Sequence, residues 1–165
     1  MMISKKMNAE LNAQIAAEFT AAHQYLAMAC SLDAMGLKVL CKWFTKQYQE
    51  ETQHARKIID YLQEVGGPVE LDAVDKPTRD FADVDAIVAA SLEAELDITR
   101  KINEIMALAE SENDYATRSF ITWFVDEQVE EVASMTDLVN LVKMAGGNLL
   151  QVEARIRHEM TAAKS

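Results

Sequence analysis

The chain has 165 residues, of which 50% are hydrophobic and 26% charged, and its formal net charge is −11 at pH 7. This length suits one domain with a substantial core, and the balance excludes a disordered chain. The acidic charge argues against nucleic acid and anionic membranes as partners, because both bind clustered lysine and arginine. Small cations are the natural partners, although many acidic proteins are simply well solvated.

Residues that favour helices dominate the sequence, with only two prolines and five glycines to interrupt them. Cys30 and Cys41 lack CxxC spacing, which argues against a zinc knuckle or a disulfide framework. Residues 1–14 contain no continuous apolar run, so we expect no signal peptide. The most apolar stretch, 15–32, is interrupted by polar residues and is not expected to span a membrane. We expect a soluble, cytoplasmic, all-α protein.

The first predicted helix covers about residues 4–34, where apolar residues recur at helical spacing and Gly36 follows. The second covers about residues 37–65 and ends at the Gly-Gly-Pro sequence of residues 66–68. Because the turn between them is so short, these two helices must be antiparallel.

A long connection is predicted next, since residues 66–83 contain both prolines and no helical periodicity. About 18 extended residues reach roughly 55 to 60 Å, whereas a helix of about 27 residues is roughly 40 Å long. The connection can therefore run the full length of a helix bundle.

A third helix is predicted over about residues 84–111, with Asp83 or Asp85 as its N-cap, and a fourth ends before Gly146. A short amphipathic segment follows. The predicted architecture is one all-α domain over residues 1–165: a four-helix bundle of about residues 4–145 with one long crossover, and a fifth helix of about residues 148–161.

Every long helix carries a carboxylate in its apolar stripe. In the second helix, steps of three or four from Leu40 pass through Gln47 to Glu51. Corresponding steps in the other helices pass through Glu18, Glu95 and Glu131, the last preceded by Glu127 or Gln128. All four stripe carboxylates lie within about three residues, some 4 to 5 Å, of the middle of their helices. Antiparallel packing therefore predicts that they meet in one layer.

Such a layer needs a counter-charge, because each buried anion costs several kcal/mol and a domain has only about 5 to 15 kcal/mol of stability. No lysine or arginine falls in these stripes at this level. Protonation is one solution, and a bound metal ion is the other. His54 follows Glu51 by three residues on the same side of the helix. Oxygen-rich sites with an imidazole suit iron or manganese.

At these residues the chain resembles the ferritins, and specifically the non-haem ferritins of bacteria. The fragments that carry the resemblance are, in order, EFTAAHQYL, EETQHA, EAELDITRKINEI and WFVDEQVEE, and the resemblance covers nearly the whole chain. It implies a bundle with one crossover and a di-iron carboxylate centre.

The resemblance implies that Glu18, Glu51 and His54 hold a first iron. Glu51 would also bridge to a second iron, which Glu95 and Glu131 hold. The first position has an imidazole ligand, and the second has only oxygen ligands. The second iron is therefore expected to exchange more readily.

Further residues match accessory roles in the same family. Gln128 would lie beside the second iron, near where oxygen binds, and Tyr25 beside the centre as a hydrogen-bond partner or electron donor. Three acids match an additional iron position of some bacterial members, with Glu131 shared: Glu50, Glu127 and Glu130.

The sequence departs from two related families. Bacterioferritins have a second Glu-x-x-His in the fourth helix, where this chain has Gln128 and Glu131, and they bind haem through a methionine where this chain has Thr52. No haem is therefore expected. Rubrerythrins add a cysteine-ligated iron module, for which this chain lacks a CxxC pair.

The resemblance implies a ferroxidase that oxidises Fe(II) with O2 or H2O2 and stores Fe(III) as a mineral inside a homo-oligomeric cage of twenty-four subunits. Two alternatives stay open from the residues. One is another di-metal enzyme on the same bundle, such as a manganese catalase or an oxygenase. The other is a metal-free helical scaffold whose acidic stripes face subunit contacts.

Overall fold

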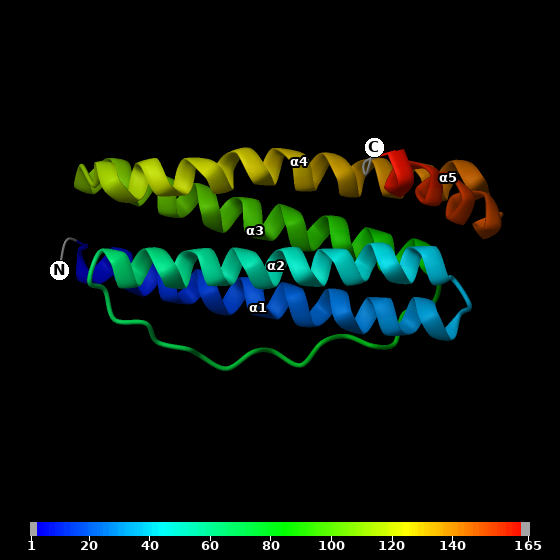
Figure 1. Cartoon of the computed structure of the whole chain (residues 1–165), viewed down its shortest axis with the longest axis horizontal. Helices are drawn as coiled ribbons and strands as arrows, with labels where there is room; N and C mark the ends of the chain where they lie inside the picture. The colour runs from blue at the N-terminus through cyan, green and yellow to red at the C-terminus, as the bar shows by residue number, and fades with distance from the viewer. Residues whose placement is uncertain (1–2, 163–165) are drawn as a thin grey trace.

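The computed structural model describes residues 3–162, so the outermost residues of the predicted domain, 1–2 and 163–165, lie outside the described residues. Within that range the chain forms five α-helices and no strand, which confirms the all-α prediction (Figure 1). The helices are α1 (Lys5–Ala34), α2 (Lys38–Glu64), α3 (Val84–Glu112), α4 (Tyr115–Ala145) and α5 (Leu149–Ala162).

The four long helices form two antiparallel hairpins, α1 with α2 and α3 with α4, and the crossover between the hairpins runs the length of the bundle (Figure 1). Side chains of α1 hold the crossover at two points. The amide of Asn12 accepts a hydrogen bond from Glu70 N (2.8 Å) and donates one to Pro68 O (3.0 Å). The amide of Gln24 makes the same pair of bonds with the backbone of Thr78, at 2.9 and 3.0 Å.

Side-chain caps fix where three of the helices begin. Ser4 accepts a hydrogen bond from the first turn of α1, and Asp114 does the same for α4. Asp83 caps α3 through Ala86 N at 2.8 Å, which decides between the two predicted caps, Asp83 and Asp85. The N-cap residue of α2, Leu37, has no side chain that can accept such a bond.

A carboxylate from α5 caps α2 instead. Glu153 is only 8% exposed, and its Oε1 accepts hydrogen bonds from Val39 N and Leu40 N, both at 2.8 Å. These two N–H groups belong to the first turn of α2, where the helix dipole also favours a negative charge. Glu153 therefore attaches α5 to the start of α2, while Val152 and Ile156 bury the apolar side of α5.

The apolar core is divided into two clusters. One cluster lies toward the α1–α2 turn and includes Met28, Leu32, Phe44, Ile87 and Leu138. The other lies toward the opposite end and includes Leu11, Ile58, Leu62, Ile102 and Phe124. Between these clusters the helix interiors carry polar residues.

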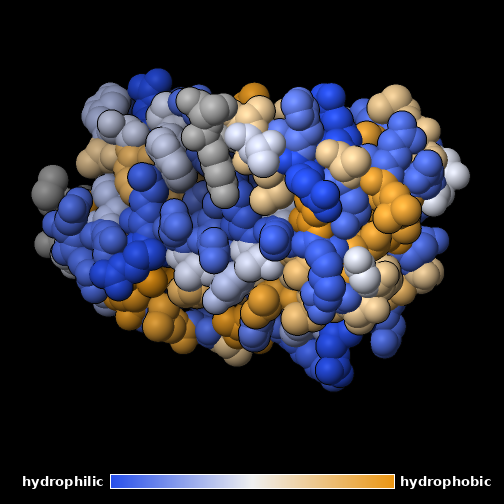
Figure 2. Space-filling model, turned by 45° about the vertical axis from the view of Figure 1, so that its right-hand side comes forward, coloured by the Kyte–Doolittle hydropathy of each residue, from blue (hydrophilic) through white to orange (hydrophobic). Residues whose placement is uncertain are grey.

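On the face of the molecule shown in Figure 2, hydrophilic residues cover much of the surface, and apolar residues gather in patches along the lower edge and toward the right. None of the helices in the described part of the chain is long and apolar enough to cross a membrane.

Replacing the capping carboxylate tests how α5 is held. We expect Glu153→Ala to lower the free energy of unfolding by about 2 kcal/mol, because it leaves two buried N–H groups of α2 without an acceptor. Urea unfolding measures the loss, and amide hydrogen exchange at Val39 and Leu40 localises it. The control is Glu159→Ala on the same helix, which removes only an exposed ion pair with Arg155 and should cost less than about 1 kcal/mol. Equal losses in both variants would refute the capping role.

Candidate metal centre

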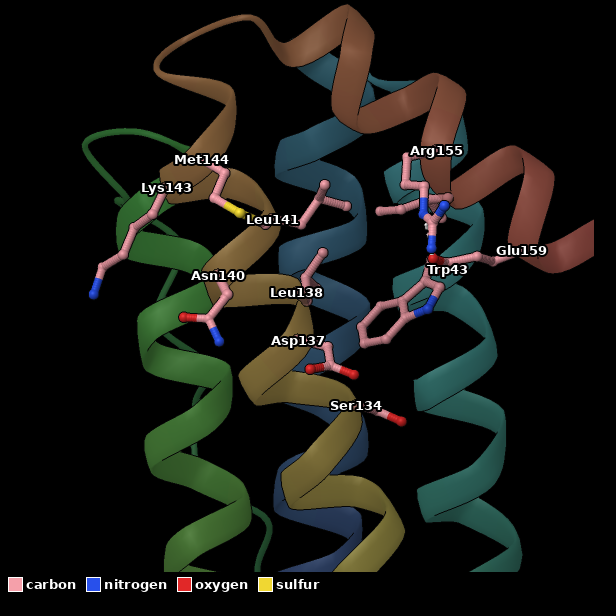
Figure 3. Close-up of a pocket in the computed structure, with 11 residues that line it drawn as sticks. Trp43, Ser134, Asp137, Leu138, Asn140, Leu141, Lys143, Met144, Arg155 and Glu159 are labelled. Carbon is pink, nitrogen blue, oxygen red and sulfur yellow. Dashed lines mark hydrogen bonds and ion pairs between the residues drawn. The ribbon is translucent and has the colours of Figure 1, made fainter.

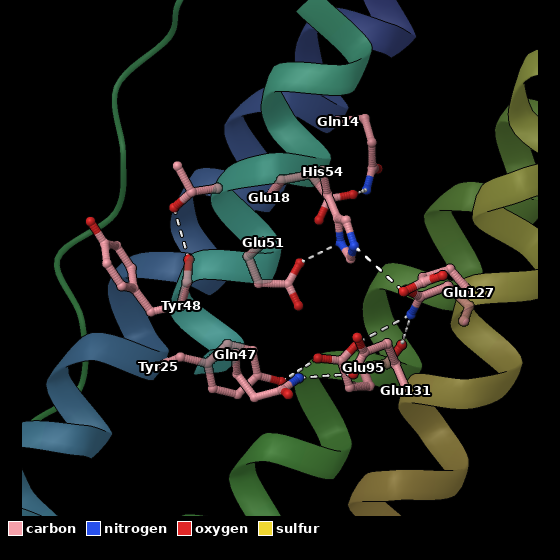
Figure 4. A network of polar contacts seen from close by, with 12 residues as sticks. Gln14, Glu18, Tyr25, Gln47, Tyr48, Glu51, His54, Glu95, Glu127 and Glu131 are labelled. Atoms are coloured by element: carbon pink, nitrogen blue, oxygen red, sulfur yellow. Dashed lines mark hydrogen bonds and ion pairs between the residues drawn. The ribbon is translucent and has the colours of Figure 1, made fainter. Parts of the chain in front are cut away.

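Four long helices bring one carboxylate each into a layer at the middle of the bundle (Figure 4). The residues are Glu18, Glu51, Glu95 and Glu131, which are 0%, 1%, 1% and 7% exposed. The midpoints of their helices fall near residues 20, 51, 98 and 130. Each glutamate therefore points inward at a common height, as the stripe positions predict, and the layer separates the two apolar clusters of the core.

The first group of potential ligands consists of Glu18, Glu51 and His54. One ligand atom from each of them lies within 4.8 Å of the others. His54 Nδ1 is 3.1 Å from Glu51 Oε2. The remaining oxygens, Glu18 Oε2 and Glu51 Oε1, are buried and have no hydrogen-bond partner. Buried carboxylate oxygens without a donor suit a cation as their partner.

A second group shares the same histidine. His54, Glu127 and Glu131 also offer ligand atoms within 4.8 Å of one another, and His54 Nε2 is 3.9 Å from Glu127 Oε1. Glu127 differs from the other ligands because its side chain is 28% exposed. The centre therefore extends from the closed middle of the bundle toward the surface of α4.

Glu95 belongs to neither of these groups and is held by neutral donors. The Tyr25 hydroxyl donates a hydrogen bond to its Oε1, and Gln128 Nε2 donates to its Oε2 at 3.1 Å. The same amide of Gln128 also lies 3.2 Å from Thr99 Oγ1. Tyr25 and Gln128, both predicted beside the centre, thus contact the carboxylate of α3.

Burial raises the pKa of every carboxyl group in the layer. Loss of water raises the pKa of Glu18 and Glu51 well above the usual value, and the neighbouring carboxylates raise both further. Burial raises the pKa of Glu95 too, although its bonds from Tyr25 and Gln128 oppose the shift. For Glu131, burial and then the charge of Glu95 raise the pKa to about 7. Without a cation, the layer therefore retains protons near neutral pH.

Basic side chains do not supply the missing positive charge. Among the ion pairs of the described residues, none joins a lysine or arginine to Glu18, Glu51, Glu95 or Glu131. The charge that would neutralise these carboxylates must come from protons or from bound cations.

The three acids predicted for an additional iron position differ in their surroundings. Glu127 joins the second group, whereas Glu50 and Glu130 belong to neither of the groups found among the described residues. Glu50 pairs with Lys46 at 2.8 Å, although its charge still contributes to the raised pKa of Glu51 and Glu131. The side chain of Glu130 is exposed.

Two buried glutamines and a tryptophan of this centre were missed by the sequence analysis. Gln14 donates to Glu18 Oε1 and Gln47 to Glu131 Oε2, both at 2.8 Å. The signal for Gln47 was its place in the apolar stripe that leads to Glu51. Trp123 is 38% exposed, and its ring lies edge-on to that of His54, 5.5 Å between centroids, beneath Lys57. The sequence contains no periodic signal that would place Trp123 beside His54.

A hollow on the surface of the described part of the chain lies elsewhere. A groove of about 770 Å³ opens between α4, α5 and Trp43 (Figure 3). Its charged side chains include the exposed ion pair of Arg155 with Glu159. None of the buried polar atoms that lack a partner belongs to a residue of this groove. The buried layer, and not this groove, has the chemistry of a metal site.

A four-helix bundle with one long crossover and a buried cluster of carboxylates and histidine defines the ferritin-like class of proteins. The model of the ferritin-like domain family matches residues 8–145. The chain therefore belongs to the ferritin-like family.

Relatives in sequence and structure agree with this assignment. Over 161 residues the chain is 37% identical to the ferritin BfrB of Mycolicibacterium smegmatis, covering 98% of this chain and 89% of the relative. It is 37% identical over 145 residues to a bacterial non-heme ferritin of Staphylococcus aureus, covering 88% and 87%. Its structure matches an open pore ferritin from the archaeon Archaeoglobus fulgidus with a TM-score of 0.92 and 39% identity, covering 94% and 96% of the two chains.

The raised pKa of Glu131 predicts how the metal-free protein responds to pH. Between about pH 4.5 and 7 the folded protein keeps a proton on Glu131 that the unfolded chain has lost, so stability falls as the pH rises through this window. Across this pH window the free energy of unfolding of the parent should fall by about 2 to 3 kcal/mol relative to that of Glu131→Gln. Urea unfolding in the presence of a chelator measures both proteins.

The matched control is Glu130→Gln, which changes an exposed carboxylate one residue away. The difference in free energy of unfolding between Glu130→Gln and the parent should stay nearly constant over the same pH range. A constant difference for Glu131→Gln as well would contradict the burial of its charge.

Proposed function

We propose that the chain is a ferritin subunit with ferroxidase activity, which oxidises Fe(II) within the bundle and stores the product as ferric mineral. The observation that carries this proposal is the layer of four buried carboxylates beside His54, with two buried oxygens that have no hydrogen-bond partner. The relatives named as ferritins support iron as the cation. We treat residues 1–165 as one ferritin-like domain.

In this proposal two Fe(II) ions bind as substrates. Glu18, Glu51 and His54 hold the first, and Glu51 also faces the second, which Glu95 and Glu131 hold. Binding displaces the protons that the raised pKa values keep on these carboxyl groups. Hard anionic oxygen ligands stabilise Fe(III) over Fe(II) and so favour oxidation.

Two neighbouring ions match the electron demand of the oxidant. Each Fe(II) gives one electron, so that O2 with two protons becomes H2O2, or H2O2 with two protons becomes two waters. Gln128 and Tyr25 orient Glu95 on the α3 side of the centre. The raised pKa of Tyr25, caused by burial and then by the charge of Glu95, keeps its hydroxyl protonated as a donor.

The product leaves through Glu127 in this proposal. Glu127 contacts His54 at 3.9 Å and is 28% exposed, so it links the buried ligands to the surface of the bundle. Glu50 is partly exposed and Glu130 is exposed, so both acidic residues have access to solvent. The second cation position has no histidine of its own, and the partly exposed carboxylate of Glu127 lies beside the centre. These features suit an ion that passes through the centre.

Removing the bridging carboxylate tests the oxidation step. We expect Glu51→Ala to abolish rapid Fe(II) oxidation, because both iron positions use this residue. Stopped-flow absorbance of the ferric product during the first two Fe(II) per chain measures the rate. Glu130→Ala is the matched control, and it should change only turnover after those first two ions. A parent rate in Glu51→Ala would refute the proposed centre.

Storage and assembly are tested on the same preparation. We expect aerobic loading to fix iron far beyond two ions per chain, in a particle of twenty-four chains. Sedimentation and iron content measured on the same fractions check both expectations. An uptake that stops at two ions per chain would favour the alternative of another di-metal enzyme, and no metal binding would favour the scaffold alternative.

A further inference from the structure

Two buried glutamines contact the carboxylate layer without being expected ligands. Gln14 and Gln47 are 2% and 4% exposed, so both amides are shielded from water. Gln14 Nε2 donates to Glu18 Oε1, and Gln47 Nε2 donates to Glu131 Oε2, each at 2.8 Å (Figure 4). Each of the two proposed cation positions thus has a carboxylate that accepts a hydrogen bond from one of these two amides, and at the second position Glu95 also accepts one from Gln128.

The chemistry of an amide suits this place better than that of an amine. An amide N–H fixes a carboxylate oxygen without neutralising its charge, whereas a lysine or arginine would form a buried ion pair and remove the attraction for a cation. The bond from Gln14 leaves Glu18 Oε2 without a partner. The carboxylate is therefore oriented in advance and still needs a positive charge.

The two amides differ in what they connect. Gln14 and Glu18 are four residues apart in α1, so this bond sets only the conformation of one side chain. Gln47 belongs to α2 and Glu131 to α4, so this bond joins the two helix hairpins across the centre. Glu131 also experiences repulsion from Glu95 and Glu50, which a neutral donor opposes without replacing the cation.

We propose that Gln14 and Gln47 are positioning residues that act on different cation positions. Gln14 orients Glu18 for the ion that shares Glu51 and His54, and Gln47 orients Glu131 for the more exchangeable second ion. This inference rests on the proposed function, because it assigns both residues to the same pair of cation positions. It predicts that each amide controls the affinity of one position alone.

The test is a calorimetric titration of the intact assembly with Zn²⁺, which does not change oxidation state and so separates binding from turnover. Methionine approximates glutamine in length and lacks the N–H donor. Gln47→Met should weaken the lower-affinity class of sites by roughly ten- to hundredfold and leave the higher-affinity class unchanged, as expected for an outer-shell partner of a ligand. Gln14→Met should do the reverse.

Two further variants separate positioning from packing. Gln53→Met changes an exposed glutamine of α2 outside the carboxylate layer and should bind Zn²⁺ like the parent. Gln47→Asn keeps the amide but is one methylene shorter, so it should weaken the same class of sites as Gln47→Met. It also provides a polar variant should the methionine variant fail to fold. Visible absorption of bound Co²⁺ gives a second readout, since its bands should change for the affected position only.

The outcomes distinguish this inference from the function on which it rests. Equal weakening of both classes by either variant, or parent affinities in Gln14→Met, Gln47→Met and Gln47→Asn, would overturn the positioning roles. In the same titration Glu51→Ala should weaken both classes. Parent binding in Glu51→Ala would overturn the proposed centre itself, whatever the glutamine variants do.

Discussion

The structure depends on one electrostatic constraint, the burial of four carboxylates in a single layer. Each is at most 7% exposed, and no lysine or arginine of the described residues forms an ion pair with them. An isolated buried charge costs several kcal/mol, against a total stability of about 5 to 15 kcal/mol for a domain. The layer is therefore compatible with a folded bundle only when protons or cations neutralise it, and this requirement links folding directly to metal binding.

The remainder of the bundle provides stability on both sides of this layer. Two apolar clusters, one toward each end, fill the interior with residues such as Phe44 and Phe124. The crossover is held to α1 by Asn12 and Gln24, and α5 is attached to the start of α2 through Glu153. These contacts involve residues other than the layer carboxylates, so the bundle is held together by more than the bonds within that layer.

Within the layer, neutral donors position the carboxylates and leave their charge intact. Tyr25 and Gln128 donate to Glu95, while Gln14 and Gln47 donate to the carboxylates of α1 and α4. The arrangement is asymmetric, because His54 lies with Glu18 and Glu51 on one side and approaches the partly exposed Glu127 on the other. This asymmetry suits a substrate ion that enters, reacts and leaves better than a permanently bound cofactor.

From the amino-acid sequence alone one can predict the helices, their antiparallel order, the full-length crossover and the common height of the four glutamates. These features follow from periodicity, from glycine and proline positions and from helix length, all of which are local properties of the chain. Which side chains surround the four glutamates became visible only in the folded bundle. Three contacts join residues on different helices: the bond from Gln47 to Glu131, the approach of Trp123 to His54 and the capping of α2 by Glu153. Such contacts depend on how each helix is rotated about its axis, and this rotation is fixed by packing against the other helices.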